Sequence, residues 1–242
     1  MAYTYEYPRP SLAVDLVVFG IGQRDHEPEL QVLLIVRGDE PFKGDPALPG
    51  GFVNVSDVGS QGEDIEEAAY RELKEETGMR PDHLEQLCTI GTPRRDPRGR
   101  VVSVAYLALV RTADHAIVAG DDAREATWMP VRDALIMHRN LAFDHGKTLC
   151  MAYDRLSAKI RYAPIGFNLL PPRFSLSELQ AIYEAVLMRK LDRANFRKRI
   201  LAMNILAEAG RQEDVPNRPA KLYRFDKRAY QKAVRDGFHF EL

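Results

Sequence analysis

The feature that most constrains this chain is the run Arg71–Glu72–Leu73–Lys74–Glu75–Glu76–Thr77–Gly78–Met79, which follows a short apolar stretch. The apolar spacing predicts a helix over 65–77 that ends at a glycine cap. At about 100° per residue, Glu72, Glu75 and Glu76 continue the stripe that is apolar one turn earlier. Carboxylates on a buried stripe repel one another and lose hydration, so this helix requires a cation.

The residue types decide which cation suits the helix. Oxygen ligands favour Mg²⁺ or Mn²⁺ over zinc, and a bound divalent ion can polarise a phosphate and activate a water for attack. Cys88 and Cys150 are the only cysteines, which excludes a disulfide scaffold and a cysteine-built zinc site. The alternative is an ordinary solvated, Glu-rich helix face, and the alignment with the apolar stripe argues against it.

This run carries a family resemblance. It matches the second half of the Nudix box, Gly-x5-Glu-x7-Arg-Glu-U-x-Glu-Glu-x-Gly-U, where U is aliphatic, and Glu63 stands at the required distance before it. The sequence therefore resembles the Nudix family. Eleven residues separate Gly51 from Glu63 where the box has five, so about six are inserted around 57–62. Either a loop is lengthened, or Asp57 takes the position of the first Glu.

The resemblance implies a β-sheet sandwiched between helices that binds a nucleoside diphosphate linked to another moiety. By motif position, Glu72, Glu75 and Glu76 would be metal ligands or the general base. Arg71 would orient these carboxylates, and the carbonyl of Gly51 would be a further metal ligand.

Two later loops hold further candidates. Some Nudix proteins take the base from a later loop, where this chain has Asp121, Asp122 and Glu125, although these residues are more typical of a turn before a strand. The arginine-rich loop 93–99 and its surroundings supply guanidiniums that suit bidentate phosphate binding, or solvated turn residues. We predict ligand contacts from four residues of these surroundings: Arg37, Phe42, Arg95 and Arg98.

Charge is divided unevenly along the chain. Residues 171–242 hold 15 Lys and Arg against 9 Asp and Glu, a balance of +6, whereas residues 1–170 hold 19 against 26, a balance of −7. The net charge of −1 is therefore an average over two unlike parts and excludes nothing about nucleic acid. The pair Pro171–Pro172 interrupts regular secondary structure and predicts a linker near 160–174. We therefore expect a Nudix domain over 1–160 and a second domain over 165–242.

The elements of the second part have the order of a winged helix-turn-helix. Ser175 and Glu178 form a capping box that opens one helix, Asp192 caps a second, and candidate strands follow over 204–209 and 220–225. The second helix can enter the major groove, where Arg reads guanine and Asn reads adenine, while the hairpin contacts phosphates. The predicted DNA contacts are Arg193, Asn195, Arg197, Lys198, Arg218 and Lys221. The alternative is a basic solvated helix on a packing or dimerisation domain.

Both parts together resemble the NrtR family of nicotinamide-related transcriptional regulators, over nearly the whole chain. The matching segments include 7–10, 95–99, 141–145 and 218–225. This resemblance implies a homodimer on double-stranded operator DNA, controlling NAD-metabolism genes and sensing ADP-ribose or a similar nucleotide. The chain departs from the family where many members have a degraded Nudix box, because its three box carboxylates are intact.

The sequence thus predicts an α+β chain with an N-terminal Nudix α/β/α sandwich and a C-terminal winged helix-turn-helix. The leading hypothesis is a nucleotide-responsive repressor. The second is an active Mg-dependent pyrophosphatase that splits ADP-ribose into AMP and ribose 5-phosphate, and the third is a hydrolase whose basic tail only stabilises a dimer. No apolar run approaches the ~20 residues of a membrane span and no signal sequence is visible, so we expect a cytoplasmic protein.

Overall fold

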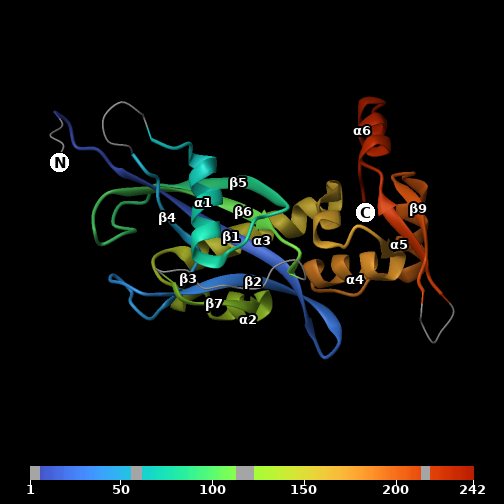
Figure 1. Ribbon diagram of the computed structural model, residues 1–242, viewed down its shortest axis with the longest axis horizontal. Coiled ribbons are helices and arrows are strands. Elements are labelled where there is room, and N and C mark those ends of the chain that lie inside the picture. The colour runs from blue at the N-terminus through green and yellow to red at the C-terminus, as the bar shows by residue number, and fades with distance from the viewer. Residues whose placement is uncertain (1–5, 56–61, 113–122, 214–218) are drawn as a thin grey trace. The chain divides into compact units, whose positions relative to one another are not determined.

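The computed structural model describes residues 6–55, 62–112, 123–213 and 219–242 of the chain. The chain divides into two compact units (Figure 1): residues 1–20 with 31–153, and residues 21–30 with 154–242. Of the residues singled out from the sequence, Asp57, Asp121, Asp122 and Arg218 lie outside the described residues.

A mixed seven-stranded sheet is the centre of the first unit. The order β3-β2-β1-β6-β5 is extended by β4, which pairs with β1, and by β7, which pairs with β2. Only β1 and β6 run parallel among the described pairs, in register from Ser11 with Val101 to Phe19 with Leu109. The strands are β1 (Ser11–Arg24), β2 (Glu27–Arg37), β3 (Pro46–Ala47), β4 (Gly50–Phe52), β5 (His83–Ile90), β6 (Val101–Leu109) and β7 (Ala123–Pro130).

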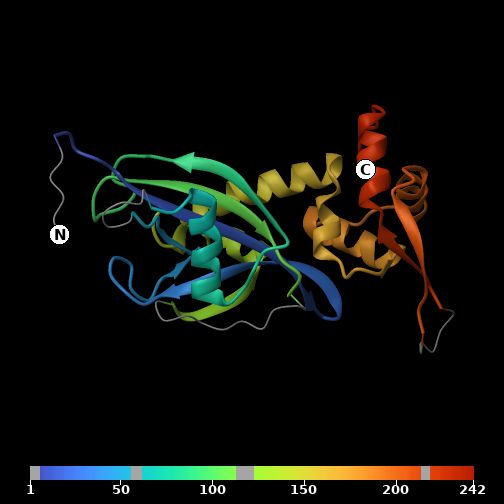
Figure 2. The same cartoon turned by 45° about the horizontal axis from the view of Figure 1, so that its top comes forward.

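Helices cover both faces of this sheet (Figures 1 and 2). The helix α1 (Ile65–Thr77) is the predicted carboxylate helix; Asp64 caps its start and Gly78, at φ 72°, ends it. Its side chains Ala68, Ala69 and Leu73 pack in one core with alternate residues of β1 and β6. On the other face lies α3 (His145–Tyr162), and the short α2 (Val131–Ile136) follows β7. The predicted α/β/α sandwich is confirmed.

The second unit has the predicted winged-helix order. A 3₁₀ segment, η3 (Pro164–Leu169), precedes β8 (Phe174–Ser175), α4 (Leu176–Leu187), α5 (Arg193–Ala202), β9 (Leu206–Arg211), β10 (Lys221–Phe225) and α6 (Lys227–Arg235), and the strands pair antiparallel in the order β8-β10-β9. Ser175 and Glu178 form the predicted capping box, and the Asp192 carboxylate accepts the Asn195 N–H. Tyr183, Phe196 and Ile200 are buried between the helices.

Three local predictions are wrong. The segment 48–53, which the sequence suggests to be a strand broken by glycines, is a strand only over β4 (Gly50–Phe52). Pro49, just before it, lacks the N–H that a longer ladder requires. The segment 160–174 is not a linker, because Ile165, Leu169 and Phe174 in it are buried. The chain does not end on a hairpin, since α6 follows β10. Among the described residues, no helix is long and apolar enough to span a bilayer.

Candidate functional site

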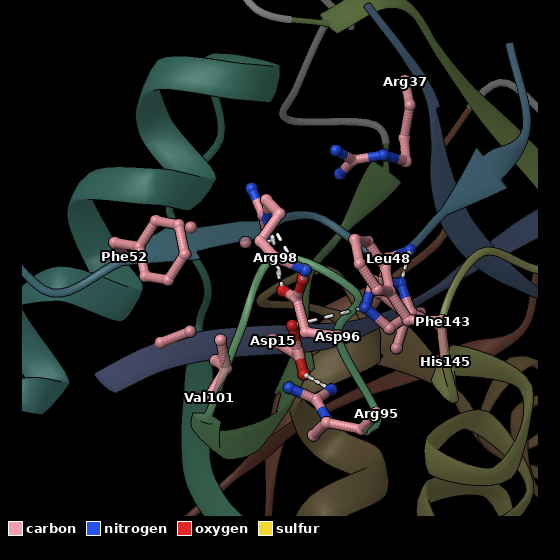
Figure 3. A pocket seen from close by; sticks show the side chains of 13 residues that line it. Asp15, Arg37, Leu48, Phe52, Arg95, Asp96, Arg98, Val101, Phe143 and His145 are labelled. Atoms are coloured by element: carbon pink, nitrogen blue, oxygen red, sulfur yellow. Dashed lines mark hydrogen bonds and ion pairs between the residues drawn. The ribbon is translucent and has the colours of Figure 1, made fainter. Parts of the chain in front are cut away.

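A pocket of about 90 Å³ opens in the first unit beside β1, β4 and the loop between β5 and β6 (Figure 3). It combines carboxylates, guanidiniums and aromatic rings with the glycine element that precedes the carboxylate helix. The lining residues are Ala13, Asp15, Arg37, Leu48, Gly50, Gly51, Phe52, Arg95, Asp96, Arg98, Val101, Phe143 and His145.

Three of the four predicted ligand residues, Arg37, Arg95 and Arg98, line this pocket. The guanidinium carbon of Arg98 lies 4.9 Å from the ring centroid of Phe52 and 5.6 Å from that of Phe143, and Figure 3 shows it between the two rings. The guanidinium of Arg37 lies 4.8 Å from the same Phe143 centroid. Burial and the neighbouring Arg98 both lower the pKa of Arg37. An anion between the two guanidiniums would relieve this repulsion, so the pair suits a phosphate group.

Arg95 lies in the same loop as Arg98 but is used differently. Its guanidinium donates to both carboxylate oxygens of Asp144, at 2.6–3.1 Å, and to Asp15 Oδ2 at 2.9 Å. The side chain is only 5% exposed. Because its donors are directed at buried carboxylates, Arg95 fixes the loop to the sheet and to the start of α3, and a ligand role for it has no support from this geometry.

Asp15 is the centre of a buried network that the sequence reading did not assign. Its carboxylate accepts the Ser103 hydroxyl at 2.6 Å and lies 3.4 Å from His145 Nε2, while His145 Nδ1 accepts the Leu48 N–H at 3.0 Å. Burial acts to raise the pKa of Asp15, but His145 and Arg95 outweigh it and hold the pKa well below its usual range. The signal was present in the sequence, since an aspartate interrupting an otherwise apolar strand requires a buried partner.

Phe42 contacts the pocket only through a second ring. It is 37% exposed and packs edge-on against Phe143 at 4.7 Å between centroids. The rings that line the pocket are Phe52 and Phe143, neither of which was singled out. A stacking role for Phe42 stays a prediction, and any such contact would extend the aromatic wall that Phe143 begins.

On α1, Arg71 joins the carboxylates as expected. Its guanidinium bonds Glu63 through Nε at 2.9 Å and Nη2 at 2.6 Å, and its Nη1 bonds both Glu72 at 2.8 Å and Glu75 at 2.9 Å. Nη2 also donates to the Phe52 carbonyl at 3.1 Å, which ties the helix to β4. Glu63 therefore keeps its place beside Arg71 despite the insertion before it.

The glycine element lies against the other side of the carboxylates. A Cβ at Gly51 would overlap the Glu72 carboxylate, and the Gly50 N–H donates to Glu76 Oε2 at 2.8 Å. Burial raises the pKa of Glu72, with Glu75 adding to the rise and Arg71 opposing it. Glu76 is buried as the helix stripe predicted, whereas the Glu75 side chain is 59% exposed, because it lies at the edge of that stripe.

The second unit distributes its predicted DNA contacts unevenly. Arg193, Asn195 and Lys198 of α5 are exposed, but Arg197 is half-buried and donates to Ser177 of α4 at 3.1 Å. On the hairpin, Lys221 is exposed and paired with Glu208 of β9. The side chains of Arg193, Asn195 and Lys198 form no hydrogen bond to another side chain in the described part of the chain.

Known protein families match the two units of the chain separately. A model of the NUDIX domain matches residues 10–151, and a model of the NrtR DNA-binding winged helix domain matches residues 166–225. The ADPR responsive transcriptional repressor NtrR of Acinetobacter baylyi is 37% identical over 225 residues, which cover 93% of this chain and 86% of that protein. This chain belongs to the NrtR family of Nudix proteins.

Other relatives support each part of this assignment. A crystal structure of Shewanella oneidensis NrtR complexed with a 27mer DNA shares 34% identity and a TM-score of 0.75, covering 91% of this chain and 95% of that one. An ADP-ribose pyrophosphatase of Methanocaldococcus jannaschii is 41% identical over 143 residues, covering 59% of this chain and 73% of that protein. Since one of these relatives is an enzyme, the donors of the carboxylate helix α1 are compared next with those that a metal ion requires.

Nudix hydrolases in general use divalent metal ions. Among the residues that the structure describes, no three His, Cys, Asp or Glu side chains gather as a ready-made metal site. The chemistry of the donors nevertheless fits a hard cation: Glu72 is desolvated with a raised pKa, it lies against the backbone of Gly51, and it shares one Arg71 nitrogen with Glu75. These oxygens are the ligands that such ions prefer.

Proposed function

We propose that this protein is an ADP-ribose-responsive transcriptional repressor that binds operator DNA as a homodimer in the cytoplasm and controls genes of NAD metabolism. The observation that carries the proposal is the Arg37–Arg98 pair above Phe143, in a chain whose other unit is an NrtR winged helix. The relative that is 37% identical over 93% of this chain is named as a repressor responsive to ADPR, and a second NrtR was crystallised with DNA.

The pocket supplies what such a nucleotide requires. Two guanidiniums at one aromatic ring match the two charges of a pyrophosphate, because each planar fork can donate two parallel hydrogen bonds. The rings of Phe52 and Phe143 provide flat apolar surface for a base or a ribose. In this assignment Arg37 and Arg98 bind the ligand, while Arg95 and Asp15 hold the walls of the pocket in place.

DNA binding would rest on the exposed side of α5 and on the hairpin. Arg193, Asn195 and Lys198 are the exposed members of the predicted set on the helix, and Lys221 is the described member on the wing. A helix of this kind reads base edges in the major groove while the wing contacts phosphates.

A gel-shift series with the DNA upstream of the protein's own gene tests the proposal. We expect a shifted band at modest salt, and we expect ADP-ribose, unlike AMP at the same concentration, to change the fraction bound. Absence of a band would refute DNA binding, and a band indifferent to ADP-ribose would refute sensing. The Arg98→Ala variant should still shift DNA but respond to ADP-ribose only at higher concentration.

A second function is favoured by the intact carboxylates: hydrolysis of ADP-ribose to AMP and ribose 5-phosphate with Mg²⁺ or Mn²⁺. Glu72, Glu75 and Glu76, with the Gly51 carbonyl, are the groups that would hold the ion, and Arg71 would orient them. A bound divalent ion would supply Lewis-acid polarisation of the phosphate and a more acidic water. Glu125 is exposed on β7 and remains a candidate base.

Incubation with ADP-ribose and Mg²⁺ tests this second function separately. Release of AMP that is lost in Glu76→Gln and kept in Lys74→Ala, an exposed neighbour on the same helix, would establish it. No product, or equal turnover in Glu76→Gln, would refute it. Good turnover without any DNA shift would instead favour a hydrolase whose basic unit only stabilises a dimer.

A further inference from the structure

Between β3 and β4 the chain changes the strand against which it pairs. β3 pairs with β2, whereas β4 pairs with β1, and Leu48 and Pro49 form the crossover between them. Pro49 has no N–H, so the N–H of Leu48 is the only backbone donor that the crossover contains. Leu48 is buried, and its N–H therefore requires an acceptor inside the protein.

The acceptor is a side chain from a distant part of the chain. His145, the first residue of α3, accepts the Leu48 N–H through Nδ1 at 3.0 Å, and Figure 3 shows its ring between Leu48 and Asp15. A backbone N–H can only donate, so Nδ1 carries no proton in this arrangement. The ring proton of His145 is therefore on Nε2.

Asp15 stabilises this form of the ring. Its Oδ1 lies 3.4 Å from His145 Nε2. Burial raises the pKa of Asp15, but His145 and Arg95 outweigh burial and hold the pKa well below its usual range, so the carboxylate is ionised. An ionised carboxylate beside Nε2 favours the tautomer with its proton there. Both ring nitrogens are thus used within the protein, so His145 is suited to positioning its neighbours and not to proton transfer.

The residue directly after the crossover contacts the carboxylate helix. Gly50 donates its N–H to Glu76 Oε2 at 2.8 Å. On its other side Gly50 is pressed against β1, because a Cβ at this position would overlap the backbone of Val14. Gly50 is two residues from Leu48, so the hydrogen bond to His145 fixes the direction in which the chain enters this closely packed position.

The crossover is held from β1 as well, through a different group. The Pro49 carbonyl accepts the Leu16 N–H at 2.8 Å. This bond fixes the oxygen side of the crossover, and His145 fixes its N–H side. Without His145, the crossover would keep one anchor and leave a buried N–H without a partner, which a chain relieves by shifting toward water or another acceptor.

We propose that His145 is a positioning residue for the carboxylate helix: through Leu48 it holds the glycine element so that the Gly50 N–H directs Glu76 and the Gly51 carbonyl lies beside the same helix. The inference rests on the proposed metal-dependent function, in which Glu76 and this carbonyl hold the ion. Groups that orient metal ligands typically contribute about tenfold to 100-fold to metal affinity.

Two substitutions separate the two contacts of His145. In His145→Asn the amide oxygen takes the place of Nδ1, so it can accept the Leu48 N–H but does not reach Asp15. In His145→Gln the amide nitrogen takes the place of Nε2, so it can donate to Asp15 but leaves the Leu48 N–H without an acceptor. Each variant loses one buried contact, so a role in stability alone predicts that the two behave alike.

Titration of the full chain with Mn²⁺ alone, followed by the electron paramagnetic resonance of the free ion, is the first measurement. We expect His145→Asn to bind Mn²⁺ within about twofold of the wild type and His145→Gln to bind it about tenfold more weakly or worse. Lys147→Ala, at an exposed position of α3, is the control and should match the wild type. Wild-type affinity in His145→Gln, or equal losses in the Asn and Gln variants, would overturn the proposal.

Amide hydrogen exchange at Gly50, measured by NMR on the full chain without metal, is the second measurement. The Gly50 amide should exchange about tenfold faster in His145→Gln and at the wild-type rate in His145→Asn, because only the former releases the crossover. Unchanged exchange in His145→Gln would refute the positioning role. If the wild type binds no Mn²⁺, the proposed metal function fails, and the exchange rates still decide whether His145 positions the Gly50–Glu76 contact.

Discussion

The arginines of the two units are in opposite circumstances. In the Nudix unit, Arg98 bonds one carboxylate, Arg95 bonds two and Arg71 bonds three. In the winged-helix unit, Arg193 and Arg199 are exposed and have no ion pair among the described residues. Position in an element does not separate the two sets, since each contains an arginine inside a helix, Arg71 in α1 and Arg199 in α5.

Burial and pairing with carboxylates distinguish arginines that hold a site in shape from arginines that are available to bind a ligand. A buried guanidinium is stable only with carboxylates around it, so it positions its neighbours. All three nitrogens of the Arg71 guanidinium, and the Nε and Nη2 of Arg95, donate within the protein. An exposed guanidinium without a partner keeps all five N–H donors for phosphate or carboxylate. Arg98 lies between the two cases, because it is paired with Asp96 on one side and faces the pocket with a 44% exposed side chain.

The strongest test of this contrast is Arg95→Ala. Its removal leaves Asp15 and Asp144 without their shared cation, so we expect the free energy of unfolding to fall by about 3–5 kcal/mol. Urea denaturation measures this change. Arg94→Ala, at the adjacent exposed position, should change stability by less than about 0.5 kcal/mol. Equal effects of the two substitutions would show that Arg95 does not hold the pocket together.

Arg98→Ala should have the next largest effect, on ligand affinity and not on folding. Loss of charge-assisted hydrogen bonds to the pyrophosphate should weaken ADP-ribose by about 1.5–3 kcal/mol, or roughly tenfold to 150-fold. Calorimetric titration of the protein with ADP-ribose, without DNA, measures this affinity. The control is Arg100→Ala, because Arg100 lies at the end of the same loop but does not line the pocket. If Arg98→Ala lowered the free energy of unfolding as much as Arg95→Ala does, Arg98 would be a structural arginine and not a ligand-binding one.

The sequence predicted those elements well whose ends are marked by capping residues and whose buried face is marked by an apolar stripe. The α1 helix could be bounded from its apolar stripe and its glycine cap, and the starts of α4 and α5 from Ser175 and Asp192. The helix α6 was missed although Ala229, Tyr230, Ala233 and Val234 recur at helical spacing, because that apolar stripe is only two turns long and none of its residues is buried. The predicted linker was wrong because prolines mark a turn equally well in a packed segment.

The site was predictable only as far as it is contiguous in sequence. The Glu72–Glu76 set lies on one helix, so helical geometry placed it. Phe143, His145 and Asp15 meet only because α3 and β1 are brought together by the fold, and no spacing in the sequence expresses that contact. Arg95 and Arg98 are three residues apart and chemically identical, so only the position of Asp144 distinguishes the structural arginine from the pocket arginine.

Within α5, the exposed Arg193 and the half-buried Arg197 can be compared by their effects on DNA sequence preference, which we expect to be smaller than the effects above. Arg193→Ala should weaken binding to the preferred operator by about 1–3 kcal/mol and relax its sequence preference if this arginine reads a base. Arg197→Ala should leave the sequence preference unchanged, because Arg197 is half-buried and bonded to Ser177. Fluorescence anisotropy with the operator and single-base variants measures both. A relaxed preference in Arg197→Ala alone would reverse the assignment of the two arginines.

The smallest effect is expected on the wing, at Lys221, which is exposed and paired with Glu208. Exposed ion pairs contribute little to folding, so Lys221→Ala should unfold at the same urea concentration as the wild type. If Lys221 contacts a phosphate, the same variant should bind all DNA sequences more weakly, and the slope of log affinity against log salt should fall by about one. Glu208→Ala is the matched variant, since it frees Lys221 without removing its charge and should strengthen DNA binding. An unchanged salt slope in Lys221→Ala would leave α5 as the DNA-contacting element and remove the wing from the interface.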